Sequence, residues 1–280
     1  MKEEKNTILL VSSKNDVASV NIANQVLSQN DFKRVEDFQE NPTYEACFPS
    51  SERVKLITLR GELVNAQDLA SSFSNLKLAV FLSRHKSESG TPTLSVHTPG
   101  NLASAALGGI PRRVSIAPAN AMRDALHKMW ALKEEFRLKY EVSYECTHHG
   151  PSLDAPAMFV ELGSSPPQWN DLPAAGVVAQ AAIEAIKQVH ARNCKTVLGI
   201  GGPHYNAKFT RIALKENMAF GHIIPKYAIA ALDAECLIQC VQKTLEKVEA
   251  IILDWKGIRS EDKAPLLRTL QSAELPIEKV

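Results

Sequence analysis

Short apolar runs alternate with longer segments of helical spacing along the whole chain, and this alternation limits the possible folds more than any other feature. Apolar runs bounded by turn residues indicate buried strands, whereas apolar residues at i, i+3, i+4 and i+7 indicate amphipathic helices. The expected strands are residues 7–11, 54–59, 76–82, 93–96, 113–117, 141–147, 157–162, 196–200 and 250–253. The expected helices are residues 16–27, 120–139, 174–190, 233–248 and 260–272.

Strands and helices in this order predict an α/β fold, a three-layer α/β/α arrangement with a mixed or mostly parallel central sheet. The 280 residues, 45% of them hydrophobic, suffice for a sizeable core. Residues 87–93 are the only linker-like stretch, and no repeat or change in composition marks a boundary. We therefore expect residues 1–280 to form a single α/β domain.

The chain lacks the signals of export, membrane insertion and general attraction to nucleic acid. Its charged N-terminus has no apolar region of a signal peptide, and no run approaches the roughly 20 apolar residues of a membrane span. Five cysteines form no C-x-x-C pair, as is typical of a reducing compartment. A net charge of +1 gives no strong field, so an RNA partner would need a local basic patch. We expect a cytoplasmic monomer that binds neither membranes nor DNA.

Six of the eight histidines lie in short clusters of Gly, Pro, Thr and Asn that follow strand-like runs. Loops at strand ends can converge at one edge of an α/β sheet, where ligands usually bind. Histidine is also the commonest metal ligand and titrates near neutral pH. These clusters therefore predict a hydrolase, and favour a metal-assisted one. They are SRH (83–85), HTPGN (97–101), THHGP (147–151), GGPHY (201–205) and GH (221–222).

Two of these features have structural alternatives. His148 and His149 are adjacent, so they face one site only if the strand ends there, and Gly150-Pro151 supplies that end. Otherwise one histidine serves the site and the other packs in the core. Glu161 at a strand end is a candidate site carboxylate or a capping, salt-bridging one. Glu145 and Asp154 are weaker carboxylate candidates nearby.

The glycine-rich segment 199–204 is not a dinucleotide loop, because His204 stands where G-x-G-x-x-G requires its third glycine. Gly201 and Gly202 instead allow the backbone to approach a bulky ligand. No H-E-x-x-H, G-x-S-x-G or Walker sequence occurs. Two mechanisms remain open: water activated by zinc, or a histidine general base with backbone N–H groups that bind the oxyanion.

Basic residues follow the His204 loop at helical spacing. Lys208, Arg211 and Lys215 lie at i, i+3 and i+7, so a helix would place them on one face. Such a stripe can contact phosphates of an RNA, or it can be an ordinary solvated face. Arg84, beside His85, is a further candidate to bind an anionic group.

The motifs, taken in order, resemble those of the D-aminoacyl-tRNA deacylases of the archaeal and plant type. The resemblance includes the ELGSS sequence at 161–165 and Trp169, and it extends to about Pro225. It implies hydrolysis of the ester of a D-aminoacyl-tRNA, such as D-tyrosyl-tRNA, with release of the D-amino acid and the tRNA. It also implies two zinc ions per subunit and a core like that of phosphorylases and peptidyl-tRNA hydrolases.

Roles follow from the motif positions and the resemblance. We expect metal ligation by His97, His148, Glu161 and His204. We expect catalysis by His85, Thr147, His149 and His222. We expect substrate contacts from Arg84, Asn101, Gly201, Gly202 and Tyr205, with tRNA contacts from Lys208, Arg211 and Lys215. Residues 98–100 and Gly201-Gly202 would form the wall that excludes L-amino acids.

Two other functions remain open from the sequence. A metal-dependent peptidase or amidohydrolase on a similar core would act on small amides without tRNA. A tRNA-binding protein without catalysis would keep its function when His148 or His149 is changed. The near-neutral net charge disfavours this second alternative.

Overall fold

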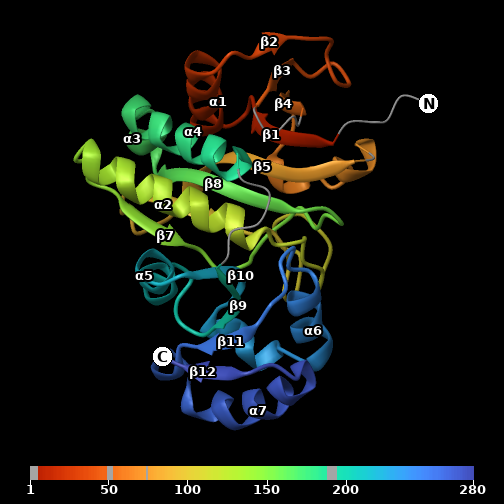
Figure 1. Ribbon diagram of the computed structural model, residues 1–280, viewed down its shortest axis with the longest axis vertical. Coiled ribbons are helices and arrows are strands. Elements are labelled where there is room, and N and C mark those ends of the chain that lie inside the picture. The colour runs from red at the N-terminus through yellow and green to blue at the C-terminus, as the bar shows by residue number, and fades with distance from the viewer. Residues whose placement is uncertain (1–5, 49–52, 74, 188–193) are drawn as a thin grey trace.

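The computed structural model describes residues 6–48, 53–73, 75–187 and 194–280, and Figure 1 shows the arrangement of its elements. Within these ranges the larger sheet has eight strands. β1, β4, β5 and β8 run parallel, whereas β6 is antiparallel to β8 and parallel to β7. This mixed sheet with helices packed on it confirms the predicted α/β class. In spatial order its strands are β2 (Lys33–Arg34), β3 (Thr43–Cys47), β4 (Arg53–Leu59), β1 (Thr7–Ser13), β5 (Leu76–Lys86), β8 (Ala157–Ser164), β6 (Thr93–His97) and β7 (Glu141–Tyr144).

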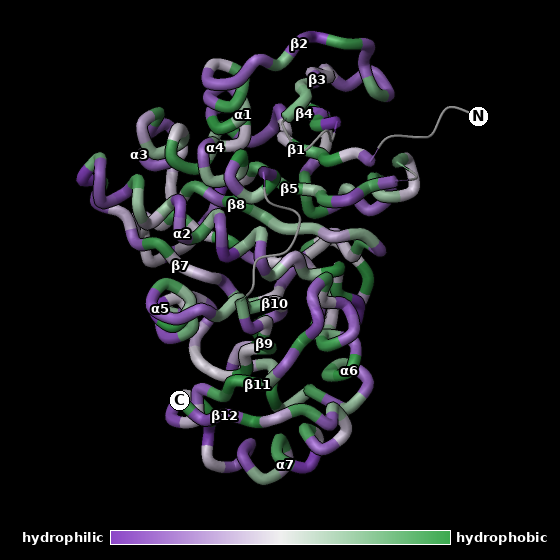
Figure 2. Tube along the Cα trace, viewed as in Figure 1, coloured by the Kyte–Doolittle hydropathy of each residue, from purple (hydrophilic) through white to green (hydrophobic). Residues whose placement is uncertain are grey.

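Helices cover one face of the larger sheet. Alternate side chains of a strand point to opposite faces, so Val80 and Val160 join the helix-side core, whereas Phe81 and Phe159 face the other way. The helices change between polar and apolar along their length (Figure 2), as amphipathic helices do. Of the helices in the described ranges, none is long and apolar enough to cross a membrane. The covering helices are α1 (Val17–Gln29), α2 (Ala119–Glu135) and α4 (Leu172–Lys187), with the short α3 (Pro166–Trp169) beside them.

The C-terminal strands form a second sheet. Among the described residues it has four parallel strands. α2 also packs on β10 and thereby connects the two sheets (Figure 1). The strands are β10 (Met218–Ile224), β9 (Lys195–Ile200), β11 (Ala250–Leu253) and β12 (Ile277–Lys279). The accompanying helices are α5 (Ala207–Lys215), α6 (Ala234–Gln242) and α7 (Ser260–Leu270), and the 3-10 segments of the molecule are η1 (Leu63–Asn65), η2 (Ala70–Ser72), η3 (Lys226–Ala231), η4 (Trp255–Gly257) and η5 (Gln271–Ala273).

Several predicted boundaries are wrong. Residues 113–117 form no strand, because Val114, Ile116 and Ala117 each make an isolated bridge to a different segment. The strand expected over 141–147 ends at Tyr144, and the helix expected over 233–248 ends at Gln242. The helix expected over 174–190 is seen as α4, whose last described residue is Lys187, and residues 188–190 lie outside the described ranges.

Loops of the two sheets meet at one edge of the larger sheet. The chain after β7 runs beside the loop after β9, where the Cys146 N–H donates to the His204 carbonyl at 3.0 Å. Thr147 N–H in turn donates to the Ile223 carbonyl of β10 at 2.9 Å. Residues after β7 are therefore held between the two sheets.

Candidate active site

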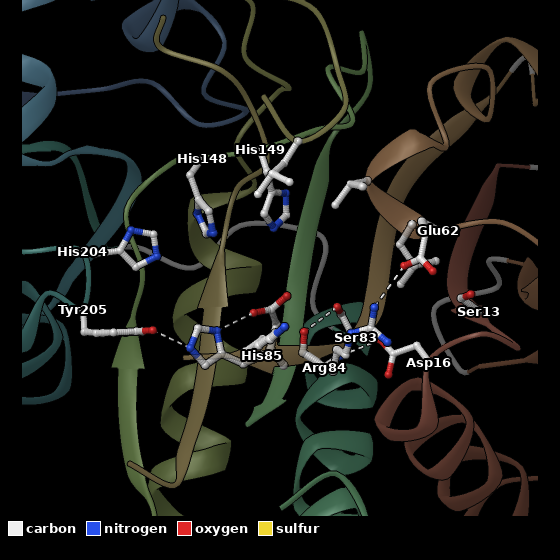
Figure 3. A pocket seen from close by; sticks show the side chains of 15 residues that line it. Ser13, Asp16, Glu62, Ser83, Arg84, His85, His148, His149, His204 and Tyr205 are labelled. Carbon is white, nitrogen blue, oxygen red and sulfur yellow. Dashed lines mark hydrogen bonds and ion pairs between the residues drawn. The ribbon is translucent and has the colours of Figure 1, made fainter. Parts of the chain in front are cut away.

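A cleft of about 530 Å³ lies at this edge of the larger sheet (Figure 3). It is formed by the ends of β1 and β5, by β8, by the chain after β7 and by the loop after β9. Segments far apart in the sequence thus supply its walls. The lining residues are Ser13, Asp16, Glu62, Leu63, Val64, Ser83, Arg84, His85, Lys86, Leu107, His148, His149, Glu161, His204 and Tyr205.

Strand register places the polar residues of β5 and β8 on one face. Ser83 lies opposite Glu161 and His85 opposite Gly163, so all of these positions share the face that carries Phe159. The face therefore changes from apolar to polar toward the strand ends. Gly163 is needed here because a Cβ atom at this position would lie 2.5 Å from the Cβ of His85.

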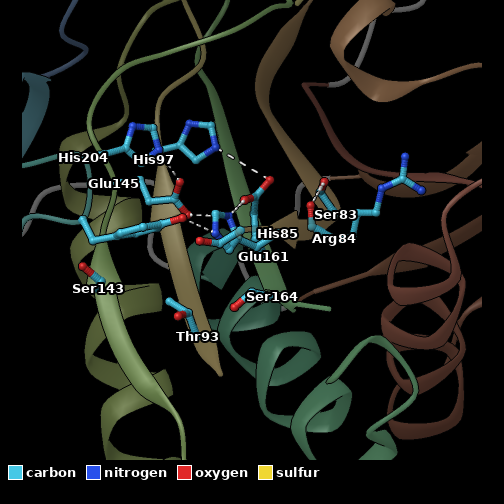
Figure 4. Close-up of polar contacts among 12 residues, drawn as sticks. Ser83, Arg84, His85, Thr93, His97, Ser143, Glu145, Glu161, Ser164 and His204 are labelled. Atoms are coloured by element: carbon cyan, nitrogen blue, oxygen red, sulfur yellow. Dashed lines mark hydrogen bonds and ion pairs between the residues drawn. The ribbon is translucent and has the colours of Figure 1, made fainter. Parts of the chain in front are cut away.

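His85 lies between two buried carboxylates (Figure 4). Its Nδ1 is 3.2 Å from Glu145 Oε1 and 3.2 Å from Glu161 Oε2, and its Nε2–H donates to the Tyr205 hydroxyl at 2.5 Å. Burial opposes the charge on the ring, but the two carboxylates outweigh it and raise the pKa of His85 to about 11. The imidazole is therefore protonated at neutral pH. Burial also opposes the charge on Glu161, but His85 and His97 lower its pKa to about 2.

Three other histidines form a separate group, of which His148 and His149 are neutral. His148 Nδ1–H donates to the Cys146 carbonyl at 2.8 Å and His149 Nδ1–H to the Gly150 carbonyl at 2.7 Å, which leaves each Nε2 with a lone pair. Burial, with neighbouring imidazoles, lowers the pKa of His148 well below 6.5 and that of His149 to about 4. The ring centroids of these two side chains are 4.2 Å apart, so both face the site.

His97 completes this group. Its ring centroid is 4.2 Å from that of His148 and 4.9 Å from that of His149. The side chain is buried, and neither ring nitrogen has a hydrogen-bond partner among the described residues. Glu161 Oε1 lies 3.7 Å from His97 Nε2. One nitrogen of each of the three histidines lies within 4.8 Å of the others, a spacing that could hold a metal ion.

A second group surrounds His204. Its Nε2 is 2.9 Å from Glu145 Oε2, and its Nδ1 is 3.2 Å from Cys146 Sγ and 3.0 Å from the Tyr227 hydroxyl. Burial opposes its charge, but the Cys146 and Glu145 contacts raise the pKa of His204 to about 10. Cys146, His148 and His204 also have the spacing of a metal site.

Three residues of the site were minor candidates, or no candidates at all, on the basis of the sequence. Glu145 was a minor candidate, yet it is fully buried and lies beside His85, His148 and His204. Cys146 is not among the site residues expected from the sequence. Tyr227 belongs to η3, far along the chain, and no motif indicated it. The position of Glu145-Cys146 directly before the THHGP motif is the only pattern that could have identified them.

Two expected catalytic residues lie away from the cleft lining. Thr147 Oγ1 is 3.0 Å from His222 Nδ1, and His222 Nε2–H donates to the Lys243 carbonyl at 3.0 Å. His222 is fully buried, and burial lowers its pKa to about 4. This pair connects β10 to the chain after β7. Asp154 pairs instead with Arg113 and Lys243 and is exposed.

The residues expected to contact the substrate divide into two sets. Arg84 and Tyr205 line the cleft, whereas Gly201 and Gly202, at φ of +108° and +76°, lie against Asp254 and Asn206 and are absent from its lining. The expected wall at Gly201-Gly202 is therefore not adjacent to the histidines. Asn101 donates to the Gly108 carbonyl at 2.9 Å and lines a second pocket.

The basic stripe does form on a helix. Lys208, Arg211 and Lys215 belong to α5, and Arg211 and Lys215 are exposed. The Lys208 ammonium group forms an ion pair with the carboxylate of Asp254. The stripe contributes no residue to the cleft lining.

Asp16 fixes the position of Arg84 at the cleft. Its Oδ1 accepts from the Ser19 N–H at 3.1 Å and so caps α1, while its Oδ2 accepts from the Arg84 N–H at 2.8 Å. The Arg84 guanidinium is 3.3 Å from Glu62 Oε2. The start of α1 thus holds the end of β5.

Sequence comparisons identify one family. The model of the D-aminoacyl-tRNA deacylase family matches residues 72–278. A D-aminoacyl-tRNA deacylase of Thermococcus kodakarensis is 36% identical over 262 residues, covering 91% of this chain and 93% of the relative. That of Methanosarcina barkeri is 32% identical over 279 residues, covering 97% and 89%. The crystal structure of a conserved protein of unknown function superposes with a TM-score of 0.88 at 29% identity, covering 98% and 95%.

Proposed function

Because this chain belongs to the D-aminoacyl-tRNA deacylase family, we propose that it hydrolyses the ester of a D-aminoacyl-tRNA in the cleft at His148 and His149. The enzyme releases a free D-amino acid and reusable tRNA, a reaction that removes the wrong enantiomer before translation. The observation that supports this site best is the meeting of His97, His148 and His149 with a protonated His85 and two buried carboxylates beside one cleft.

His97, His148 and His149 fit a zinc ion. His97 has two buried nitrogens with no hydrogen-bond partner in the described part of the chain, and carbonyl acceptors fix the tautomers of His148 and His149. Zinc prefers such imidazole and thiolate ligands. We propose one ion between His97 and His149 and a second between Cys146 and His204, with His148 available to either. When bound, zinc supplies a Lewis acid for the ester carbonyl.

Side chains of this chain move the protons. Glu161 lines the cleft as a carboxylate, so it can accept a hydrogen bond from water and direct the water oxygen at the carbonyl carbon. His85 Nε2–H donates to the Tyr205 oxygen, which turns the phenol proton toward the cleft. As the bond from the carbonyl carbon to the ribose oxygen breaks, that oxygen can take its proton from Tyr205, and the proton that the attacking water loses to Glu161 then restores the Tyr205 hydroxyl by way of solvent. Glu145 and Glu161 stabilise the positive charge of His85 during the reaction.

We propose that the enzyme acts as a cytoplasmic monomer. His85, His148 and His204 reach the cleft from three segments of a single chain. All five cysteines are free thiols, as is common in a reducing compartment. The macromolecular partner is the tRNA of the substrate itself.

Histidine variants test the location of the site. We expect His148→Ala and His149→Ala to lower kcat/KM for D-tyrosyl-tRNA by about 100-fold or more, because each removes a group of the reaction centre. His127→Ala is the matched control, since His127 lies on α2 and bonds the Ala213 carbonyl at 2.8 Å. It should stay within about twofold of wild type. Wild-type rates in both cleft variants, with circular dichroism unchanged, would exclude this site.

A further inference from the structure

Two pockets meet at His148 and His149. The cleft described above is one, and a smaller pocket of about 290 Å³ is the other. They share Leu107, His148 and His149, so the two pockets adjoin at the proposed reaction centre. We propose that they divide the substrate: the larger takes the 3′-terminal nucleoside of the tRNA, and the smaller takes the amino acid side chain. This assignment rests on the proposed function.

The smaller pocket suits an apolar side chain. Its lining contains no Asp, Glu, Lys or Arg among the residues that the structure describes. The walls come from two strips, the loop 100–107 and the segment of η3 that carries Tyr227 and Ala231. Small residues leave room in the middle, and the Tyr227 ring supplies an aromatic wall. Such a pocket accepts side chains of different shape with little discrimination between them. Its small residues are Ala103, Ala106, Ala228 and Ala231.

The larger pocket suits a nucleoside and its phosphate. The hydroxyl of Ser13 and the carboxylates of Asp16 and Glu62 offer hydrogen bonds for ribose hydroxyls and a base (Figure 3). Arg84, 34% exposed at its side chain, and Lys86 supply positive charge for the phosphate that connects the terminal nucleoside to the rest of the tRNA. Ser13, Arg84 and Lys86 lie in the last residues of β1 and β5, Asp16 follows β1, and Glu62 follows β4. These are the carboxyl ends of parallel strands, where phosphorylated ligands usually bind.

Leu107 separates the two pockets. It is 63% exposed and belongs to both linings. A large apolar side chain left in solvent next to a reaction centre is explained if the bound substrate covers it. An aminoacyl ester that spans both pockets would do so, with its carbonyl carbon near His148 and His149.

Filling the smaller pocket tests the assignment. Ala231→Trp places a bulky side chain there from an exposed position, and Ala230→Trp, also exposed and next in the chain but outside the lining, is the matched control. The measured quantity is the ratio of kcat/KM for D-tyrosyl-tRNA to that for D-alanyl-tRNA. We expect Ala231→Trp to lower this ratio by about tenfold or more, and Ala230→Trp to leave it unchanged. Arg84→Ala should lower both rates by the same factor, because the nucleoside is common to the two substrates.

The outcomes separate this assignment from the proposed function. If the wild-type enzyme hydrolyses neither substrate, the proposed function fails. If it hydrolyses both and Ala231→Trp leaves their ratio unchanged, the assignment of the smaller pocket is wrong while the function stands. A third outcome would reverse the assignment: Arg84→Ala changes the ratio, and Ala231→Trp affects both substrates equally. The amino acid side chain would then occupy the larger pocket and the terminal nucleoside the smaller one.

Discussion

Glu145 is the residue on which the polar contacts of the site converge. Its two oxygens lie 3.2 Å from His85 and 2.9 Å from His204, inside the protein, where a carboxylate is costly unless it is paired. Burial opposes the charge, but the contacts with His204 and His85 lower the pKa of Glu145. One residue therefore holds together side chains that come from both sheets.

His222 gives the protein a sensitivity to acid that can be measured. Burial lowers its pKa from 6.5 to about 4, so between these values the unfolded state binds a proton that the native state does not. The stability due to neutral His222 is complete above pH 6.5 and is lost as the pH falls toward 4. At pH 5 the loss amounts to about 2 kcal/mol in the free energy of unfolding.

Denaturant unfolding of metal-free wild type and His222→Gln at pH 7 and pH 5 measures this effect. The variant should lose less stability than wild type between the two pH values, by about 2 kcal/mol. His148 and His149 contribute equally to both proteins, so the difference isolates His222. Identical pH slopes would show that folding does not lower the pKa of His222.

Sequence motifs identified the histidines of the site better than they identified the residues that contact these histidines. His85, His97, His148, His149 and His204 do come together, although β6 and β7 run antiparallel to β5 and β8, so these strands do not all end at one edge. His222 was grouped with them because it follows a glycine, yet it lies within β10 and packs in the interior. Tyr227 reaches the site only through the packing of η3, which no local pattern contains.

At the scale of elements, the start of α1 supports the end of β5. Asp16→Ala removes the cap of α1 and the acceptor of the Arg84 N–H together. We expect a loss of about 1–2 kcal/mol in the free energy of unfolding and a higher KM for D-tyrosyl-tRNA. Asp233→Ala is the control, because Asp233 caps α6 through the Cys236 N–H but does not line the cleft.

Thermal or denaturant unfolding and steady-state kinetics distinguish the two variants. Asp233→Ala should lose similar stability with KM unchanged. An unchanged KM in Asp16→Ala as well would show that the cap acts on stability alone and does not hold Arg84 in place.

Elements with strong periodicity were predictable, and those that depend on distant partners were not. β5, β8 and α2 follow from runs of apolar residues at regular spacing. Residues 113–117 have a strand-like composition, but their backbone bonds to three separate segments and forms no ladder. The glycine-rich sequence at Gly201 and Gly202 predicted a loop that contacts the ligand. In the structure both residues have positive φ angles in a turn that packs on Asp254.

At the scale of the whole molecule, the site lies where two sheets meet. Alternation of strands and helices predicted the α/β class, but it could not tell one sheet from two, because every strand has the same local pattern. The second sheet supplies His204 and Tyr205 through the loop after β9. Activity therefore depends on both sheets being folded and in contact.

Metal content is a property of the assembled molecule. We expect chelation to remove activity and zinc to restore it, with up to two zinc ions per chain by elemental analysis and a higher Tm in the loaded protein. His97→Ala should bind less zinc than wild type, while His127→Ala should bind the same amount. Full activity in metal-free protein would favour the histidine-base mechanism over the metal-assisted one.

Chirality of the substrate is the most direct test of the function at the cleft. The measurement is the rate of amino acid release from D-tyrosyl-tRNA beside L-tyrosyl-tRNA, with zinc-loaded wild type and the His149→Ala variant. Rapid hydrolysis of the D-ester alone, lost in His149→Ala, is the expected result. Equal rates on the two esters, or hydrolysis of neither, would contradict a chirally selective deacylase centred on His148 and His149.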